Sequence, residues 1–348
     1  MKEKLLKRIE YLSDKYENEN DFLFQLKNLV FNLDIQDNVI RETKTFENLL
    51  LENLDSIQSN EPCDNLIKTG FDNIDEVLGG FSLGEYVVIG SRPSFGKTQL
   101  LINLALHISQ IMPVLFYSLN LSGYILMNRF ISTLTKISIQ KIHQKDLSEE
   151  ELQMISTVKK ELSKYKLFFN DSPNSSIDTV KEICSNQINE NNVKVIILDY
   201  LQLMSSYRYR KHRELEVGHI SRELKKIAKE NNVCVIVTSQ LSRSVEMRYG
   251  AKRPQLSDLR ESGAIEQDAD KVLLVHRPEQ YGFIEDEEGN SLLNIVELII
   301  AKNRNGKIGD VRLCKDIHFT TLKDAEAIPE DFTFSNDRLN ELSGDAPF

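Results

Sequence analysis

The stretch Ser91-Arg-Pro-Ser-Phe-Gly-Lys-Thr98 joins two segments of opposite character. Residues 86–90 before it form a short apolar run, which is typical of a buried strand. Residues 99–108 after it carry apolar side chains at helical spacing. A strand, a tight loop and Gly-Lys-Thr at the start of a helix together form the context of a phosphate-binding loop.

Each residue type in this loop suits a phosphate. Gly96 allows the backbone to come close to the anion, and the amides at the start of the new helix point toward it. Lys97 supplies a positive charge, and the hydroxyl of Thr98 can ligate Mg²⁺. Ser91 stands where the usual pattern begins with glycine, so an ordinary strand-to-helix turn is the alternative interpretation.

The composition favours a folded protein with a substantial core. The chain has 348 residues, 41% of them hydrophobic, which suggests one large domain with a smaller one, or two domains. Its 43 Lys and Arg against 53 Asp and Glu give a formal charge of −10, which argues against coating nucleic acid with the whole surface. A local basic channel stays compatible with this total, because salt limits the reach of distant charges to about 10 Å.

The four cysteines, Cys63, Cys184, Cys234 and Cys314, are far apart and form no Cys-x-x-Cys pair. This spacing predicts free thiols in a reducing cytosol rather than a metal site. No apolar run approaches the roughly 18 residues of a membrane span, and the charged first residues lack the apolar core of a signal peptide. We therefore expect a soluble, cytoplasmic protein without membrane association.

Residues 1–60 contain neither proline nor glycine and are predicted to be helical. Two apolar faces repeat at helical spacing, one at Phe22, Leu26 and Val30, the other at Phe46, Leu49, Leu50, Leu54 and Ile57. This region is either an arm that packs on something outside the chain or a small helical cap on its own domain.

Beyond the phosphate loop, predicted strands and helices alternate. Their apolar strands are continuous rather than alternating, which predicts an α/β fold with a mostly parallel sheet covered by helices on both faces. Turns at 286–290 and 305–306 indicate an antiparallel C-terminal extension. The predicted strands are 114–119, 166–170, 193–199, 233–239, 271–276, 293–301 and 311–313, and the predicted helices are 124–135, 149–164, 177–191 and 214–232.

Two polar residues end buried strands. Asp199 follows a run of four apolar residues and is placed to hold the water shell of Mg²⁺ beside the phosphate loop. Gln240 ends the next strand, where its amide can sense a terminal phosphate by hydrogen bonding. The alternatives are a helix cap or turn residue for Asp199 and a helix cap for Gln240.

Two further groups of cations lie in the second half of the chain. Lys302 and Arg304 lie on a predicted hairpin whose turn is Asn305-Gly306, and they are either solvated or reach a nucleotide held by a neighbouring subunit. A second group can follow a phosphate backbone or form a solvated loop. It comprises Arg243, Arg248, Lys252, Arg253 and Arg260.

Five segments resemble motifs of the bacterial replicative DNA helicase family (DnaB type). They are the phosphate loop 91–98, Leu-Asp-Tyr-Leu-Gln-Leu-Met at 198–204, Ser-Gln-Leu-Ser-Arg-Ser-Val-Glu at 239–246, Arg-Glu-Ser-Gly-Ala-Ile-Glu-Gln-Asp-Ala-Asp at 260–270 and Ala-Lys-Asn-Arg-Asn-Gly at 301–306. The resemblance covers residues 46–320. The block at 260–270 separates the chain from recombinases and clock-type ATPases that share the phosphate loop.

The resemblance implies a RecA-like P-loop ATPase domain that forms a hexameric ring, encircles single-stranded DNA and translocates with ATP and Mg²⁺. It implies that Ser94, Gly96, Lys97, Thr98 and Gln99 bind the nucleotide. In the same way, Asp199 supports the metal that Thr98 ligates, and Gln240 senses the phosphate. Lys302 and Arg304 act across the subunit boundary, and Arg260, Glu261 and Gly263 contact DNA. Replication proteins or a helicase loader are candidate partners.

The resemblance also divides the chain. It implies a short N-terminal region at 1–45, a linker helix and connector at 46–66, an ATPase domain at 67–322 and a tail at 323–348. The family has a substantial helical domain where this chain has about 45 residues without a match, so primase recruitment is not carried over.

The sharper departure is at Asn120. The family has Ser-Leu-Glu-Met-Ser where this chain has Ser-Leu-Asn-Leu-Ser at 118–122, and that glutamate activates the attacking water. An amide cannot accept a proton at neutral pH but can orient a water, so we expect slow turnover unless a carboxylate such as Glu214 or Glu216 compensates. The sequence thus favours an ATP-dependent DNA helicase subunit. The alternatives are a hydrolysis-impaired DNA clamp or helicase-regulating partner, and a nucleotide-binding structural protein.

Overall fold

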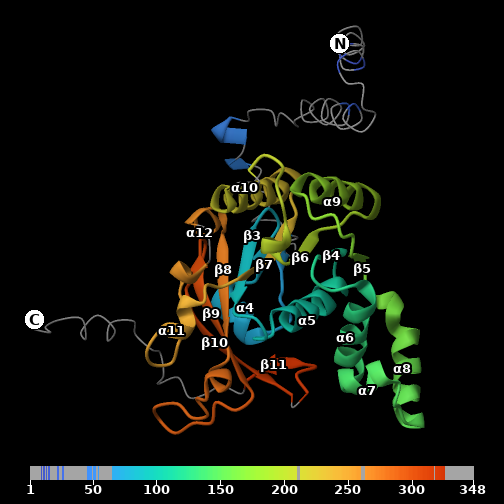
Figure 1. The fold of residues 1–348 in the computed structure, drawn as a ribbon, viewed down its shortest axis with the longest axis vertical. Helices are drawn as coiled ribbons and strands as arrows, with labels where there is room; N and C mark the ends of the chain where they lie inside the picture. The colour runs from blue at the N-terminus through green and yellow to red at the C-terminus, as the bar shows by residue number, and fades with distance from the viewer. Residues whose placement is uncertain are drawn as a thin grey trace, which may run out of the picture. The chain divides into compact units, whose positions relative to one another are not determined.

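In the computed structural model the chain divides into two compact units, Met1–Pro62 and Cys63–Phe348. The structure describes residues 65–209, 212–259, 263–316 and 318–325 of the second unit. In the first unit it describes residues 9, 11, 13, 15, 22, 26, 45–48, 50, 51 and 54. Figure 1 shows the second unit as a central sheet with helices packed on it.

Within the described residues, the sheet has nine strands in the order β11-β10-β9-β8-β3-β7-β6-β4-β5. The strands from β8 to β5 are parallel, whereas β9, β10 and β11 continue the sheet in antiparallel fashion. The predicted α/β fold, mostly parallel with an antiparallel C-terminal extension, is therefore confirmed. The strand bounds are β3 (Tyr86–Ser91), β4 (Val114–Ser118), β5 (Leu167–Asn170), β6 (Val195–Asp199), β7 (Cys234–Gln240), β8 (Lys271–His276), β9 (Ile295–Asn303), β10 (Gly309–Lys315) and β11 (Leu322–Asp324).

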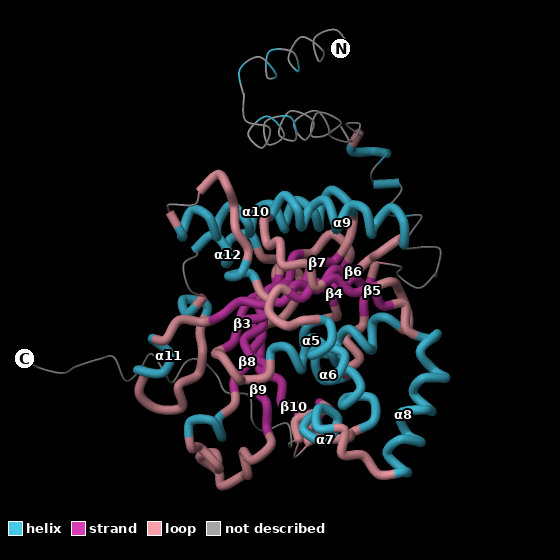
Figure 2. The backbone as a smooth tube through the Cα atoms, turned by 45° about the vertical axis from the view of Figure 1, so that its right-hand side comes forward, coloured by secondary structure: helices cyan, strands magenta, loops and turns pink. Residues whose placement is uncertain are grey.

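Helices cover both faces of this sheet (Figures 1 and 2). One face carries α4 (Asp72–Leu78), α5 (Lys97–Ser109) and α6 (Gly123–Thr135). The other carries α9 (Ile177–Asn191) and α10 (Arg213–Asn231). The remaining elements are the ribbon β1 (Leu66–Ile67) with β2 (Phe81–Ser82), the helices α7 (Ile139–Gln144), α8 (Glu149–Glu161), α11 (Ser244–Met247) and α12 (Gly263–Asp268), and the 3₁₀ turns η1 (Leu162–Lys164), η2 (Leu201–Leu203), η3 (Leu256–Asp258) and η4 (Pro278–Tyr281).

Each face of the sheet has its own apolar core, and successive residues of one strand alternate between the two. Val87 and Ile89 of β3 belong to the core under α5, whereas Tyr86 and Val88 belong to the core under α10. A central parallel strand must therefore be apolar at every position, which explains its continuous run in the sequence. All six residues of β3 are buried.

Short polar residues set several helix ends. Ser148 begins α8 with a capping box, since its hydroxyl accepts from the amide of Glu151 and the Glu151 carboxylate accepts from the amide of Ser148. The hydroxyl of Ser176 accepts from the amide of Thr179 at the start of α9. These caps fix where helices enter from the loops at the sheet edges.

In the first unit, the described positions Ile9, Tyr11, Ser13, Lys15, Phe22, Leu26, Phe46–Asn48, Leu50, Leu51 and Leu54 are helical. The hydroxyl of Thr45 accepts from the amide of Asn48, so Thr45 caps the segment that follows it. Phe46, Leu50 and Leu54 are exposed. Val30, Leu49, Ile57 and the tail from residue 326 lie outside the described residues.

Two of the four cysteines, Cys184 and Cys234, are buried as free thiols. Burial raises the pKa of Cys184 to about 12, so this thiol stays protonated and unreactive at neutral pH. In the part of the chain that the structure describes, no helix combines the length and the apolar character needed to cross a membrane.

Candidate nucleotide-binding site

The loop between β3 and α5 has the backbone of an anion site. Ser94 and Gly96 both adopt left-handed conformations, with φ of 67° and 98°, and α5 begins at Lys97. The left-handed turn aims the amides of the first helical turn back toward the loop, and these amides have no partner within the helix. Such a helix start attracts a phosphate group.

Lys97 is a partly buried cation without a carboxylate partner among the described residues. Among the described residues, no Asp or Glu oxygen lies within 4 Å of its ammonium, which instead lies 5.2 Å from the ring centre of Tyr200. Burial lowers the pKa of Lys97, the nearby charge of Arg92 lowers it further, and Asp199 opposes the shift. A phosphate at this position would relieve the buried charge, so the loop fits the nucleotide that the sequence predicts.

Thr98 and Asp199 meet at the carboxyl edge of the sheet. The hydroxyl of Thr98 donates to Oδ2 of Asp199 at 2.8 Å, and the hydroxyl of Thr238 donates to Oδ1 of the same carboxylate at 2.7 Å. Asp199 is buried, and β6 holds it two strands from the phosphate loop. A hydroxyl and a carboxylate are the hard oxygen donors that Mg²⁺ prefers, so this pair also fits the predicted metal.

Gln240 lies at the same edge, paired in register with Ser91 at the end of the adjacent strand. Gln202 holds its backbone, because Oε1 of Gln202 accepts from the amide of Gln240 at 3.0 Å and Nε2 of Gln202 donates to the hydroxyl of Ser239 at 2.8 Å. The structure thus brings Gln240, Asp199 and the phosphate loop together. We did not single out Gln202 or Thr238 from the sequence, although both lie within or beside the quoted motifs.

Asn120 lies two residues past the end of β4. The amide of Leu119 donates to the carbonyl of Asp199 at 2.8 Å, which ties this turn to β6. The hydroxyl of Ser118 donates to the carbonyl of Leu121 at 2.7 Å and closes the turn around Asn120. Asn120 is exposed at the same edge as Lys97.

Gln99 points away from this edge. Its amide nitrogen donates to the hydroxyl of Thr133 at 2.9 Å and to the carbonyl of Thr320, and the side chain is buried. What Gln99 can still offer a phosphate is its backbone amide in the first turn of α5.

An aromatic ring from the loop between β10 and β11 lies against the phosphate loop. A Cβ at Gly96 would lie 2.2 Å from Cζ of Phe319, so only glycine fits there. The guanidinium of Arg277 lies 4.6 Å from the centre of the same ring and donates to the carbonyl of Ser94 at 3.2 Å. No local sequence pattern indicates this contact, because Phe319 lies 223 residues from Gly96 along the chain.

A second cation fixes the other side of the loop. Arg92 donates through Nε and Nη2 to one oxygen of Glu246, at 2.8 and 2.7 Å, and through Nη1 to the carbonyl of Leu241. This ion pair joins the phosphate loop to α11. Arg92 is buried and was not among the predicted site residues.

Lys302 and Arg304 lie at the opposite edge of the sheet. Asn303 at the end of β9 pairs with Lys271 at the start of β8, and β8 runs parallel to β3. The hairpin is therefore level with the start of β3, whereas Lys97 follows its end. The structure does not bring these two cations to the phosphate loop of the same chain.

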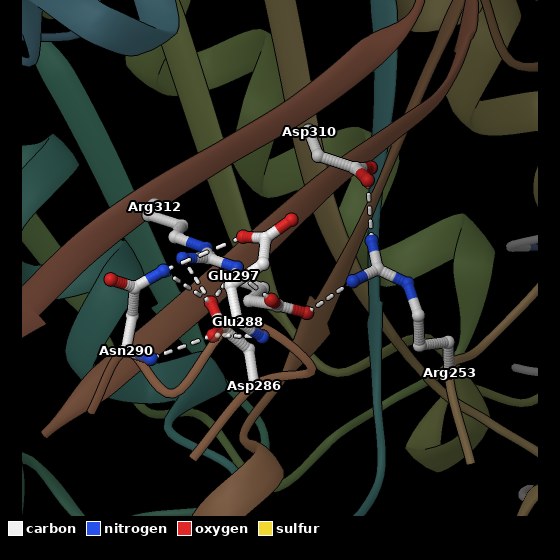
Figure 3. A network of polar contacts seen from close by, with 7 residues as sticks. All are labelled: Arg253, Asp286, Glu288, Asn290, Glu297, Asp310 and Arg312. Atoms are coloured by element: carbon white, nitrogen blue, oxygen red, sulfur yellow. Dashed lines mark hydrogen bonds and ion pairs between the residues drawn. The ribbon is translucent and has the colours of Figure 1, made fainter. Parts of the chain in front are cut away.

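Two arginines of the predicted basic group, Arg248 and Arg253, are ion-paired within the chain. Arg253 donates to Glu297 at 2.6 Å and to Asp310 at 2.5 Å, as Figure 3 shows. Arg248 pairs with Asp258 at 2.9 Å, and Lys252 lies 5.3 Å from the ring centre of Tyr281. Ion pairing leaves the two arginines little freedom to follow a phosphate backbone.

Figure 3 shows a second ion pair of the same network, between Arg312 and Asp286 at 3.4 Å. Asp286 also accepts from the amide of Asn290, which fixes the turn between η4 and β9. Burial raises the pKa of Glu297, while Arg253 and Arg312 oppose the shift. The network therefore fastens the basic loop to β9 and β10.

Gly263 is the first residue of α12 and borders a cleft of about 380 Å³ between α10 and α12. Arg260 and Glu261 lie outside the described residues. Glu216 cannot take the place of a catalytic base, because it accepts from the amide of Ser206 at 2.8 Å and pairs with Arg213 at 2.7 Å. Glu214 is exposed and borders the same cleft.

Comparison with known proteins identifies the family of this chain. The family model of the DnaB-like helicase C-terminal domain matches residues 67–324. A probable replicative DNA helicase of Trieres chinensis is 38% identical over 306 residues, covering 87% of this chain and 65% of the relative. The replicative DNA helicase DnaC of Bacillus subtilis is 35% identical, covering 78% of this chain and 61% of the relative. The chain thus spans under two thirds of the length of these relatives.

Two solved structures are also similar. One is an ATPase domain that is 33% identical with a TM-score of 0.74, covering 82% of this chain and all of that one. The other, a DnaB-like replicative helicase studied with its interactions with primase, is 29% identical with a TM-score of 0.75, covering 93% of this chain and 75% of that one. The chain therefore belongs to the family of DnaB-like helicase C-terminal domains.

Proposed function

We propose that this chain is a subunit of an ATP-dependent DNA helicase, a motor that moves along single-stranded DNA as a ring of identical subunits. Residues 67–322 form its ATPase domain, 46–66 a linker helix and connector, 1–45 a short helical N-terminal region and 323–348 a tail. The family supports the proposal, and so does one geometric relationship: the phosphate loop and the Lys302–Arg304 hairpin lie at opposite edges of one sheet.

The nucleotide site is proposed at the carboxyl edge. Backbone amides of Ser94, Gly96 and Gln99 and the ammonium of Lys97 would hold the phosphates of ATP. Thr98 would ligate Mg²⁺, and Asp199 would accept from its water shell. When bound, the metal neutralises charge that develops on the phosphates during hydrolysis.

In the proposed site, the cations that complete the nucleotide pocket come from a second copy of the chain. Arg304 is level with Tyr86 at the start of β3, because Asp270 binds both residues. Five residue steps of about 3.3 Å place Ser91, where the phosphate loop begins, roughly 17 Å further along the strand. An arginine side chain does not span this distance. Lys302 and Arg304 would therefore meet the nucleotide of a neighbouring copy, as an arginine finger does.

This arrangement favours a head-to-tail assembly. A pocket at one edge and its completing cations at the other make a heterologous contact, which closes as a ring when the rotation between copies allows it. We propose a hexameric ring in the cytoplasm, with replication proteins or a helicase loader as further partners.

DNA contact is assigned to the segment that leads into α12. Arg260, Glu261 and Gly263 would meet the DNA backbone, the arginine by charge and the glycine by its amide. The pairing of Arg248 and Arg253 within the chain supports this narrower assignment over the whole basic loop.

Gln240 would hydrogen-bond the terminal phosphate from the end of β7. Asn120 would orient the attacking water without taking its proton, so turnover would be slow compared with a chain that carries glutamate there. Glu216 does not supply the missing base in this proposal, because it is paired with Arg213.

The test measures ATP hydrolysis with and without single-stranded DNA, together with ATP-dependent strand separation of a forked duplex. We expect DNA to stimulate hydrolysis and strands to separate, and both activities to vanish in Lys97→Ala. Arg304→Ala should keep nucleotide affinity while hydrolysis falls by about 10³-fold, the usual effect of an arginine finger. DNA that is retained with nucleotide but never unwound would contradict the motor and indicate a clamp. A wild-type chain without DNA stimulation would contradict the DNA contact.

A further inference from the structure

Arg304 is held in place by its own chain. Its Nη1 lies 3.1 Å from Oδ1 of Asp270, and its backbone amide donates to the carbonyl of Asp270 at 2.9 Å. The side chain of Arg304 is 53% exposed, whereas that of Asp270 is 6% exposed. An exposed ion pair contributes little to the stability of a fold. The contact between Arg304 and Asp270 therefore matters for the position of the guanidinium rather than for stability.

Asp270 is itself a rigid acceptor. Its second oxygen accepts from the amide of Tyr86 at 2.8 Å and from the ammonium of Lys225. The carboxylate is thereby fixed between the central strand β3 and helix α10. With one nitrogen of Arg304 near Asp270 and about half of the side chain exposed, the other N–H groups of the planar guanidinium remain available for phosphate oxygens.

The neighbouring contacts fix the rest of the hairpin. Lys302 donates to the carbonyl of Glu266 in α12, and Asn303 donates to the carbonyls of Leu78 at 3.2 Å and Lys307 at 3.0 Å. The register between β8 and β9 shifts just before Lys302, where β9 contains one extra residue. A bulge of this kind re-aims the side chains that follow it.

We propose that Asp270 is a positioning residue that aims Arg304 at the nucleotide of the neighbouring copy, and that α12 joins this contact to the DNA-binding segment. The proposal rests on the proposed function, in which Arg304 acts in trans and Gly263 contacts DNA. Gly263 begins α12, Glu266 in the same helix holds Lys302, and Asp270 follows two residues after its end. A displacement of Gly263 would therefore reach both cations through the eight consecutive residues 263–270.

The first experiment compares Asp270→Asn with the wild type in ATP hydrolysis. Asn removes the charge that holds Arg304 and keeps an oxygen for the amide of Tyr86. We expect kcat to fall by about 10- to 100-fold, because a misplacement near 1 Å has an effect of this size. KM should be unchanged, because the phosphate loop of the same chain is intact. Stimulation by single-stranded DNA should also be lost.

The matched control is Lys225→Met. It removes the other charged partner of Asp270 and leaves Arg304 paired, so a purely structural role of this cluster predicts similar losses for both variants. We expect Lys225→Met to lower kcat and DNA stimulation clearly less than Asp270→Asn does, because the amide of Tyr86 still holds the second oxygen of Asp270. The double variant Asp270→Asn/Arg304→Ala should be no slower than Arg304→Ala alone, because both changes remove one interaction. Additive losses would overturn the proposal.

Mixed assemblies separate a misplaced finger from a damaged pocket. The Asp270→Asn variant has an intact phosphate loop but a misplaced Arg304. The Lys97→Ala variant has a correctly placed Arg304 but a damaged phosphate loop. Mixing them should restore hydrolysis above the sum of the two separate activities, since the intact halves meet at some subunit boundaries. Absence of restoration would overturn the proposal. If Asp270→Asn does not fold, Asp270→Glu, which keeps the charge and displaces it by one methylene group, should give the same result.

The outcomes distinguish a failure of the proposed function from a failure of the positioning role of Asp270. A wild-type chain that hydrolyses no ATP would refute the proposed function itself. Wild-type kcat and DNA stimulation in Asp270→Asn, with Arg304→Ala inactive, would refute the positioning role alone.

Discussion

The hydroxyl of Thr98 donates to the carboxylate of Asp199 across 2.8 Å, joining the start of α5 to the end of β6. Thr238 holds the second oxygen of the same carboxylate at 2.7 Å, so Asp199 has one orientation before any metal binds. A preset carboxylate of this kind raises metal affinity because less ordering is needed on binding.

Asp199→Asn should weaken Mg²⁺-dependent nucleotide binding by about 10- to 100-fold, the usual effect of losing an outer partner of a metal site. Titration of a fluorescent ATP analogue with and without Mg²⁺ measures this. Without the metal, variant and wild type should bind equally. Thr238→Val is the matched control, since it removes a partner of Asp199 away from the metal and should have a smaller effect. Equal loss with and without Mg²⁺ would contradict the assignment.

Nucleotide affinity should depend on pH through Lys97. Burial lowers the pKa of this ammonium in the free chain, and bound phosphates would raise it again. Binding therefore takes up protons, and affinity should fall by up to tenfold per pH unit once the pH exceeds the pKa of the free chain. Calorimetry in two buffers of different ionisation enthalpy detects the uptake. Lys97→Arg, whose guanidinium stays protonated, should show none.

Asn120→Glu should raise kcat for ATP hydrolysis by about 10²-fold or more, because it supplies the missing general base. The affinity for ATP should change little, since Asn120 is exposed beyond the phosphate loop. Asn120→Gln is the control, because it adds the same length without a carboxylate. Single-turnover hydrolysis separates the chemical step from product release. A native rate that the glutamate does not raise would rule out an impaired base.

Arg253→Ala should destabilise the protein without weakening DNA binding. Removing Arg253 leaves Glu297, which is 4% exposed, without its closest cation. We expect a loss of about 1–2 kcal/mol in the free energy of unfolding, below the 3–5 kcal/mol of a fully buried pair because Arg253 is partly exposed. Thermal unfolding and DNA affinity are measured on the same samples. Arg260→Ala should show the opposite pattern, with lower DNA affinity and unchanged stability.

Acidification should destabilise the protein partly through His276. Burial and the nearby charge of Arg253 lower the pKa of this imidazole to about 4 in the folded chain. Between pH 6.5 and about 4 the unfolded chain binds a proton that the folded chain does not, so stability falls by up to about 3 kcal/mol across this window. His276→Phe keeps a ring against Tyr281 and should lose less stability on acidification. Parallel pH curves for the two proteins would contradict this role.

The sequence predicts those elements whose structure is determined by residues close together along the chain. The strand at 86–90, the loop through Thr98 and the helix after it appear as expected, because residue pattern alone dictates each of them. Asp199 and Gln240 could be placed near the loop because the ends of neighbouring parallel strands share an edge. The helix predicted at 214–232 is observed at Arg213–Asn231.

Contacts between distant segments could not be predicted in this way. Arg253 pairs with residues 44 and 57 positions away, so a loop that looked free to bind phosphates is fastened to β9 and β10. Phe319, which contacts Gly96, lies in the loop before β11, and this three-residue strand is too short to show a pattern in the sequence. The inward direction of Gln99 likewise depends on Thr320.

The reversal of chain direction between β8 and β9 has a kinetic consequence. It carries the hairpin away from the phosphate loop of its own chain. A solitary copy would, in the proposed mechanism, hold ATP but lack the cations that complete the reaction. In the proposed mechanism, hydrolysis per molecule is then not a fixed property of the polypeptide. The hydrolysis rate per molecule should decline when the protein is diluted below the concentration at which copies associate, and it should recover when the protein is concentrated again. The specific rate of ATP hydrolysis would then report directly on assembly.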